Sequence, residues 1–146
     1  MSRARSARIA SRQRPELVTE TKVLGQAESG EVYIVSGSAA ISLTLPSPQQ
    51  GSYFKFIYGG VTTASLAMDQ DMYITGAAGN IMVGSVVNVP LAEAPMQIVT
   101  ANMSTNDRII TITGPAAGGD YVECVSDGTN WYVNGFVSGT VAFSAS

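Results

Sequence analysis

The stretch AISLTLP, residues 40–46, alternates apolar and polar side chains without interruption. Ile41, Leu43 and Leu45 fall on one side of an extended chain, with a serine and a threonine between them on the other. Side chains alternate between the two faces of a β-strand, so this period predicts a half-buried strand. Pro46 and Pro48 close it, because proline cannot donate a hydrogen bond to a neighbouring strand.

Short apolar segments of the same kind recur about every ten residues along the rest of the chain, separated by Gly, Asn, Asp or Pro. The segments are SYFKFIY, MYITG, NIMVGSVVNVP, MQIVT, RIITITG and YVECVS, and we expect the aromatic SYFKFIY to be a central strand. Residues 62–72 alone are compatible with one or two helical turns. Many short strands with frequent turns predict an all-β fold, a small antiparallel sandwich or barrel.

The segment SDGTNWYVNG, residues 126–135, predicts the turn and return strand of a hairpin. A two-residue turn centred on Asp127-Gly128 suits the twist of a hairpin. It would pair Ser126 with Thr129, Cys124 with Trp131, Val122 with Val133, Glu123 with Tyr132 and Tyr121 with Asn134. A slip by one residue would move Glu123 into the core and Trp131 out of it. We therefore expect Trp131 to anchor the core rather than to bind a ligand.

Charge is divided unevenly along the chain. The first fourteen residues contain no acid and five of the eight basic residues, namely Arg3, Arg5, Arg8, Arg12 and Arg14. From Pro15 onward three basic residues stand against eleven acidic ones, a formal charge of −8. Such asymmetry is typical of an interaction tail. The first twenty residues also lack apolar periodicity, which favours an extended N-terminal arm that becomes ordered on its partner.

These patterns divide the chain into three parts: a basic arm at residues 1–21, one β-domain at 22–136, and a C-terminal strand or tail at 137–146. The last segment is too apolar for a free tail, and we expect it to pair with a neighbouring copy. It contains Val137, Val141 and Phe143, and Phe136 directly precedes it. Charged residues are only 13% of the chain, about half the usual share. A surface so poor in charge favours burial against copies of itself or a partner.

Few residues offer catalytic or metal-binding chemistry. The chain contains no histidine, which excludes Ser-His-Asp and Cys-His triads. A single cysteine, Cys124, forms no intrachain disulfide, and its apolar neighbours indicate a buried side chain. We interpret Asp69 and Asp71 as a solvated turn rather than a cation site. Glu123 and Asp127 should be exposed near the hairpin tip. Gly114 to Gly119 is interpreted as a connector, since no phosphate-binding pattern follows it. We expect no enzyme, no cofactor and no metal.

No apolar stretch approaches the roughly 20 residues needed to span a bilayer, and no apolar segment follows the basic N-terminus as in a secretory signal. We therefore expect no membrane partner, although an Arg- and Ser-rich leader also fits a mitochondrial transit peptide. The five arginines can neutralise about five phosphates. However, the remainder of the chain has a formal charge of −8 and repels nucleic acid, so we do not expect nucleic acid as the partner. An acidic protein surface or neighbouring copies suit the arm better, because guanidinium groups bind carboxylates bidentately.

Three strings together resemble a pattern of tailed-phage virion proteins. They are ISLTLPSPQQGSYFKFIYGG, YITGAAGNI and VSDGTNWYVNG, and the resemblance covers about residues 41 to 135. The closing string occurs in tail fibres, head fibres and capsid decoration proteins alike. This chain has no shaft repeats and no collagen-like or coiled-coil segment. It therefore looks like a capsid decoration (cement) protein.

The resemblance implies a homotrimer in the virion, made in the host cytoplasm and bound outside the expanded head at threefold positions. The partner would be the major capsid protein. Extended arms would cross the joints between capsomers, with the five arginines of the arm docking and Pro15 stiffening its exit. One alternative is a tail or head-fibre module that binds the host, with Tyr73 and Tyr132 as exposed contacts. Another is a nucleic-acid-associated or organelle-targeted protein that uses the basic leader.

Overall fold

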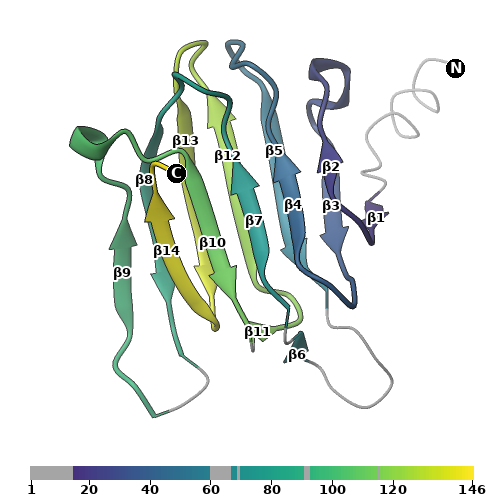
Figure 1. The fold of residues 1–146 in the computed structure, drawn as a ribbon, viewed down its shortest axis with the longest axis vertical. Helices are drawn as coiled ribbons and strands as arrows, with labels where there is room; N and C mark the ends of the chain where they lie inside the picture. The colour runs from purple at the N-terminus through teal and green to yellow at the C-terminus, as the bar shows by residue number, and fades with distance from the viewer. Residues whose placement is uncertain (1–14, 60–66, 69, 91–92, 115) are drawn as a thin grey trace, which may run out of the picture.

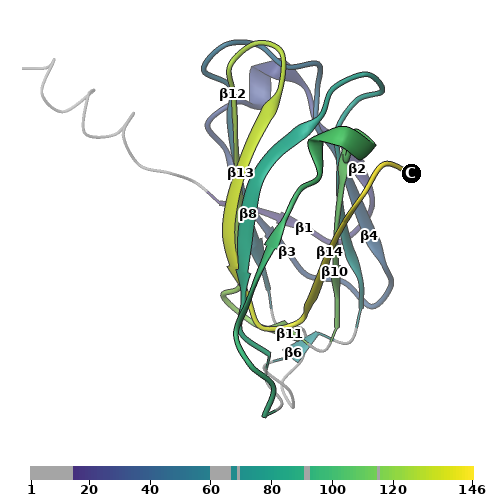
Figure 2. The same cartoon turned by 90° about the vertical axis from the view of Figure 1, so that its left-hand side faces the viewer.

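The computed structural model describes residues 15–59, 67–68, 70–90, 93–114 and 116–146. It is an all-β sandwich of two packed sheets (Figures 1 and 2), as the strand patterns predict. The seven-stranded sheet, called sheet A below, runs in the order β1 (Glu16–Val18), β3 (Val32–Val35), β5 (Tyr53–Tyr58), β12 (Tyr121–Ser126), β13 (Trp131–Val137), β8 (Met82–Asn88) and β9 (Gln97–Thr100).

The five-stranded sheet, called sheet B below, packs on one face of sheet A. Its order is β14 (Thr140–Ser144), β10 (Ile109–Thr113), β7 (Met72–Thr75), β4 (Ile41–Thr44) and β2 (Lys22–Val23). A two-stranded ribbon of β6 (Ala67–Met68) and β11 (Ala116–Ala117) lies at one end of the sandwich (Figure 1). Two 3-10 turns, η1 (Gln26–Glu28) and η2 (Met103–Thr105), connect strands.

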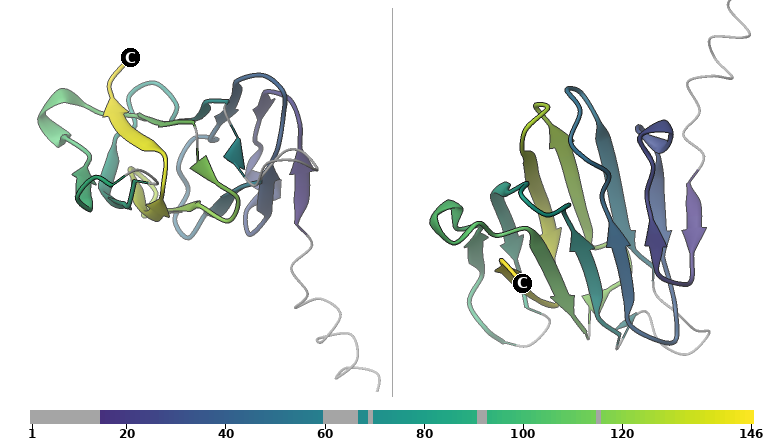
Figure 3. Two further views of the ribbon diagram at one scale, coloured as in Figure 1. Left: turned by 90° about the horizontal axis from the view of Figure 1, so that it is seen from below. Right: turned by 45° about the horizontal axis from the view of Figure 1, so that its top comes forward.

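Strand direction differs from the antiparallel arrangement that we expected. Of the eleven strand pairs within the described residues, five are parallel, including the central pairs of β3 with β5 and of β8 with β13. Parallel neighbours need long crossovers rather than tight turns. Here the chain crosses between the two sheets, so strands close in sequence often lie in different layers (Figure 3).

The core fills the space between the sheets. Ile41, Leu43 and Leu45 are buried as the alternation predicts, and β5 is a central strand with Phe54, Phe56 and Tyr58 turned inward. Aromatic rings dominate this layer: the ring of Trp131 lies 5.8 Å from that of Phe54, centroid to centroid, in a tilted arrangement. Trp131 is fully buried, which confirms its predicted place in the core.

The hairpin of β12 and β13 keeps the predicted faces but not the predicted register. Ser126 pairs with Trp131 and Cys124 with Val133, two residues further along β13 than expected. The turn holds four residues because the carboxylate of Asp127 accepts hydrogen bonds from the backbone N–H groups of Thr129 and Asn130. A shift of two leaves every side chain on its face, so the apolar pattern could not distinguish the two registers.

Glycine permits the close approach of β8 and β13. Gly84 has a φ of 126°, and a Cβ atom there would lie only 2.1 Å from the carbonyl oxygen of Val133. Any other residue would meet both a clash and a disfavoured backbone conformation. The single parallel ladder that links β8 to the hairpin therefore depends on this glycine.

Both ends of the β-domain extend beyond the boundaries that we expected. Residues 16–18 form β1 and pair with β3, so the described part of the expected arm belongs partly to sheet A. The predicted C-terminal strand exists as β14, and it pairs with β10 of its own chain at one edge of sheet B. Residues 62–72 lie mostly outside the described residues, and the two at 67–68 form a strand rather than a helical turn.

Candidate functional site

An unbroken line of apolar side chains crosses the outer face of sheet A, the face turned away from the core. Strand register aligns one residue from each of the seven strands, from one edge of the sheet to the other. We call this line the apolar row; it consists of Leu17, Ile34, Ile57, Tyr121, Phe136, Val87 and Ile98.

The apolar row is accessible to solvent. Leu17 is 63% exposed and Ile98 69% at the two edges, and Phe136 is 43% exposed near the middle. The other four side chains are half-buried. Single exposed apolar residues are common on protein surfaces, but a contiguous line of them marks an interaction site. Seven neighbouring strands contribute to this one.

A second line, the polar row, runs beside the first. It consists of Lys55, Glu123, Asn134, Ser85 and Thr100, and the buried Val32 continues the line on β3. Lys55 lies 3.0 Å from a carboxylate oxygen of Glu123 and 4.6 Å from the centre of the Tyr121 ring. The hydrogen bond to Glu123 raises the pKa of Lys55 above its usual range. The charges of this row therefore neutralise each other.

A third line, the aromatic row, lies on the far side of the polar row. It consists of Tyr53, Val125, Tyr132 and Val83. The Tyr53 hydroxyl donates to Glu123, and the Tyr132 hydroxyl donates to Asp127 at the hairpin tip. These tyrosines keep their rings at the surface while their hydroxyl groups are already hydrogen-bonded.

The three basic residues of the body all have partners within the chain. Lys55 is paired as described above. Lys22 lies 2.6 Å from Glu16 and 2.7 Å from Glu28. Burial on its own lowers the pKa of Lys22, but the hydrogen bonds to Glu16 and Glu28 outweigh it and raise the pKa. The side chain of Arg108 donates to the backbone carbonyls of Ala145 and Gly76.

Lys22 also fastens the start of the body. Glu16 belongs to β1 and Glu28 to η1, so one ammonium group holds two segments together at the edge of sheet A. The backbone N–H of Gly25 donates to Glu28 at 2.6 Å, and this bond and Lys22 lower the pKa of Glu28. The segment that follows the basic arm is thus tied down within a few residues of Pro15.

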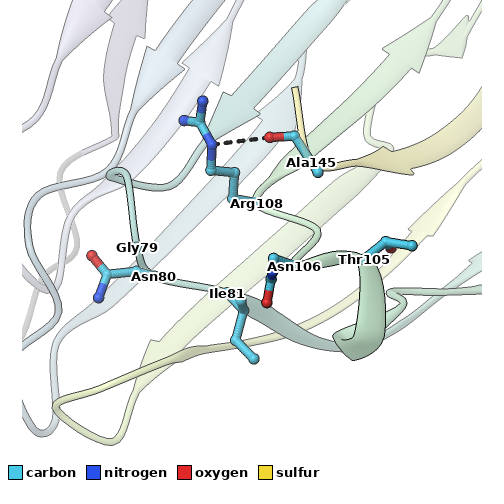
Figure 4. A pocket seen from close by; sticks show the side chains of 7 residues that line it. All are labelled: Gly79, Asn80, Ile81, Thr105, Asn106, Arg108 and Ala145. Carbon is cyan, nitrogen blue, oxygen red and sulfur yellow. Dashed lines mark hydrogen bonds between the residues drawn. The ribbon is translucent and has the colours of Figure 1, made fainter.

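A shallow pocket of about 360 Å³ lies beside Arg108, between the β7–β8 connection, η2 and the C-terminal residues. Figure 4 shows the guanidinium group bonded to Ala145, with the side chains of Asn80, Ile81 and Asn106 pointing away from it. The polar groups do not converge on a common point, as they do in a specific ligand site. Instead, Arg108 holds the C-terminal residues in place through its hydrogen bond to the backbone carbonyl of Ala145.

The five arginines predicted to dock the arm lie outside the described residues, as does Asp69. Asp71 accepts a hydrogen bond from the Tyr73 hydroxyl, and no group of three Cys, Asp or Glu side chains suited to a metal ion occurs in the described ranges. Asp127 is exposed as expected, whereas Glu123 is half-buried in its ion pair. Cys124 is buried as expected, and burial raises the pKa of its thiol.

Comparisons with known proteins return no match: no protein family, no curated protein and no solved structure is similar to this chain. Of the helical segments in the described part of the chain, none has the length and apolar character to cross a bilayer.

Sequence reasoning missed the apolar row. Its members are scattered from residue 17 to residue 136, and no two are adjacent in sequence. A local signal did exist: SYFKFIY and YVECV carry apolar or aromatic residues on both faces instead of alternating with polar ones. Apolar residues on both faces of a strand are typical of sheets that are covered on both sides.

Proposed function

We propose that this chain is a non-catalytic structural virion protein, a capsid decoration (cement) protein that binds the outside of an expanded phage head and clamps neighbouring capsomers. The observation that carries the proposal is the division of charge. All three cations of the acidic body are engaged within the chain. The remaining five basic residues of the chain are the arginines of the first fourteen residues, and the proposal assigns the acidic partner to them.

The proposed mechanism is mechanical. A clamp that binds only the expanded lattice stabilises that state by mass action. In a homotrimer three arms would act together, because docking of the first places the others at high effective concentration. The major capsid protein is the proposed partner, and its surface carboxylates would accept bidentate hydrogen bonds from the guanidinium groups of the arm.

Such a clamp must transmit force from its arm to its body. The arm joins the body at Pro15, and β1 follows directly, paired with β3 and tied by Glu16 to Lys22. A pull on the arm therefore loads a backbone ladder and an ion pair rather than a loose loop. This local geometry suits a body that resists a force applied through its arm.

The direct test compares three forms of the chain on purified expanded heads and on unexpanded proheads: the wild type, a variant with all five arm arginines changed to lysine, and one with all five changed to glutamine. We expect the glutamine variant to keep the fold of the body and lose most of its affinity for expanded heads. The lysine variant should bind with intermediate affinity, because it keeps the charge but not the bidentate hydrogen bonds. Unchanged saturation of expanded heads by the glutamine variant would contradict the arm assignment.

One observation favours a second function, a tail or head-fibre module that binds the host. Tyr132 is exposed at the hairpin, with its hydroxyl oriented by Asp127, and rigid exposed tyrosines are common in recognition surfaces. Glycan-array binding by residues 15–146, lost in Tyr132→Ala and kept in Tyr73→Ala, would support this function over the first.

A further inference from the structure

We propose that the outer face of sheet A is a self-association surface, which in solution is covered by the same face of another copy of this chain. The proposal stands on the apolar, polar and aromatic rows of the described body and does not depend on the basic arm. It goes beyond the proposed clamp by naming the surface through which two copies meet, and a two-fold contact of this kind makes a dimer rather than the homotrimer of the clamp.

The charge of the face identifies the partner. The described body carries most of the −8 of the chain from Pro15 onward, but the three rows contain one lysine and one glutamate in contact with each other. Two acidic bodies repel least where they meet through a face without net charge, because the like charges then lie farther apart and are screened by salt. A neutral apolar face gives a strongly charged partner nothing to pair with, whereas a second copy brings the same neutral face.

The arrangement of the rows is self-complementary. The polar row lies between the apolar and aromatic rows, because Glu123 lies between Tyr121 and Val125 along β12. A two-fold axis in the plane of contact and parallel to the strands places each row on the same row of the other copy, polar on polar and apolar on apolar. Sheet faces pack on each other in this way within sandwiches, and a two-fold contact uses the same patch on both partners.

The size of the face also fits. Seven strands at about 4.8 Å spacing make a face about 34 Å wide. Four of the strands have six or seven residues, a height of about 20 Å, and the other three have three or four, which gives a projected area of about 600 Å². A stable interface takes about 800 Å² from each partner.

The test measures the mass of the full chain in solution by sedimentation equilibrium over a range of concentrations. One chain has a mass of 15.2 kDa, and we expect the two-fold contact to give twice this mass. The double variant Phe136→Thr with Ile98→Thr removes apolar contact from a central and an edge strand without changing charge or β-propensity. We expect it to weaken association by at least about tenfold.

The control is Ile109→Thr with Val23→Thr, which likewise replaces an apolar side chain by threonine on an inner strand and on an edge strand, at the outer face of sheet B. It should leave association unchanged. Leu17→Thr with Ile98→Thr serves as a second test variant, since both residues are highly exposed and contribute little to folding.

Three results would overturn the proposal. The first is a wild-type chain that is monomeric at high micromolar concentration. The second is equal weakening by the test and control variants, which would indicate unspecific apolar contact. The third is a monomeric wild type whose test variant loses binding to expanded heads while the control keeps it. That result would assign the face to a different protein instead of a second copy.

Discussion

The two outer faces of the sandwich cover the same core but differ in composition. On sheet A the apolar row carries an aliphatic or aromatic residue at each of seven strands. The corresponding line across sheet B is Ser144, Ile109, Thr75, Thr44 and Val23, and the line beside it is Ala142, Thr111, Tyr73 and Ser42. Hydroxyl groups dominate both.

Threonine and serine keep the extended backbone of a strand while presenting a polar group to water. Sheet B is therefore built as a solvent-facing layer, as is usual for one face of a sandwich. Sheet A instead carries an apolar outer face, which the proposed contact with a second copy would bury. Strand propensity alone would allow either composition on either sheet, so we attribute the contrast to what each face meets.

The largest expected effect concerns the core that both faces share. Trp131→Ala should destabilise the fold by about 3–5 kcal/mol, because it empties a fully buried aromatic site. Tyr132→Ala, one residue away but facing outward, should cost less than about 1 kcal/mol. Urea unfolding of both variants measures the difference. If sheet B stayed folded in Trp131→Ala, the two faces would not rest on one core.

A smaller effect is expected from the ion pair that neutralises the face of sheet A. Lys55→Met should lower stability by about 0.2–1 kcal/mol and weaken self-association, because it leaves Glu123 with no cation at the contact. Glu123 raises the pKa of Lys55 in the folded state. The stability that the ion pair adds is therefore complete below the pKa of Lys55 in the unfolded chain, and it is lost as pH rises through the pKa of Lys55 in the folded protein. The free energies of unfolding of the wild type and of Lys55→Met, measured between pH 8 and pH 11, should therefore converge only at the alkaline end. Identical wild-type and variant curves at pH 8 would contradict this role.

A converse change should make sheet B resemble sheet A. Thr44→Val with Thr75→Val replaces two hydroxyl groups by methyl groups on neighbouring strands, and it should alter the free energy of unfolding by less than about 0.5 kcal/mol. We expect the variant to gain concentration-dependent association, which light scattering measures. An unchanged mass at every concentration would show that apolar composition alone does not make these faces associate.

The smallest expected effect is local to the hairpin tip. Hydrogen bonds from the backbone N–H groups of Asn130 and Thr129 lower the pKa of Asp127. Because the pKa of Asp127 is lower in the folded protein, the stability that its hydrogen bonds add is present above the pKa of the unfolded chain. It is lost as pH falls through the pKa of the folded protein. The protection of the tip amides against hydrogen exchange, relative to their intrinsic rate at each pH, should fall below about pH 4, with the protection of β5 and β12 unaffected. Loss of protection along the whole hairpin would mean that the turn stabilises more than itself.

Local patterns predicted the strands well. The alternation at Ile41 to Leu45, the aromatic strand at Tyr53 to Tyr58 and the burial of Trp131 all follow from neighbouring residues. The hairpin register was wrong by two residues because the side chain of Asp127 builds a longer turn. Parallel pairing was missed because it joins strands that are distant in sequence, such as β8 and β13.

By itself the sequence determined which side chains of each strand point inward, since that choice depends only on alternation within a few residues. It also determined the division between a basic leader and an acidic body, which is a matter of composition. Only the tertiary structure decided which strands are neighbours and in what register. For that reason the apolar row, whose seven members come together through six separate pairings, exists only once the chain has folded.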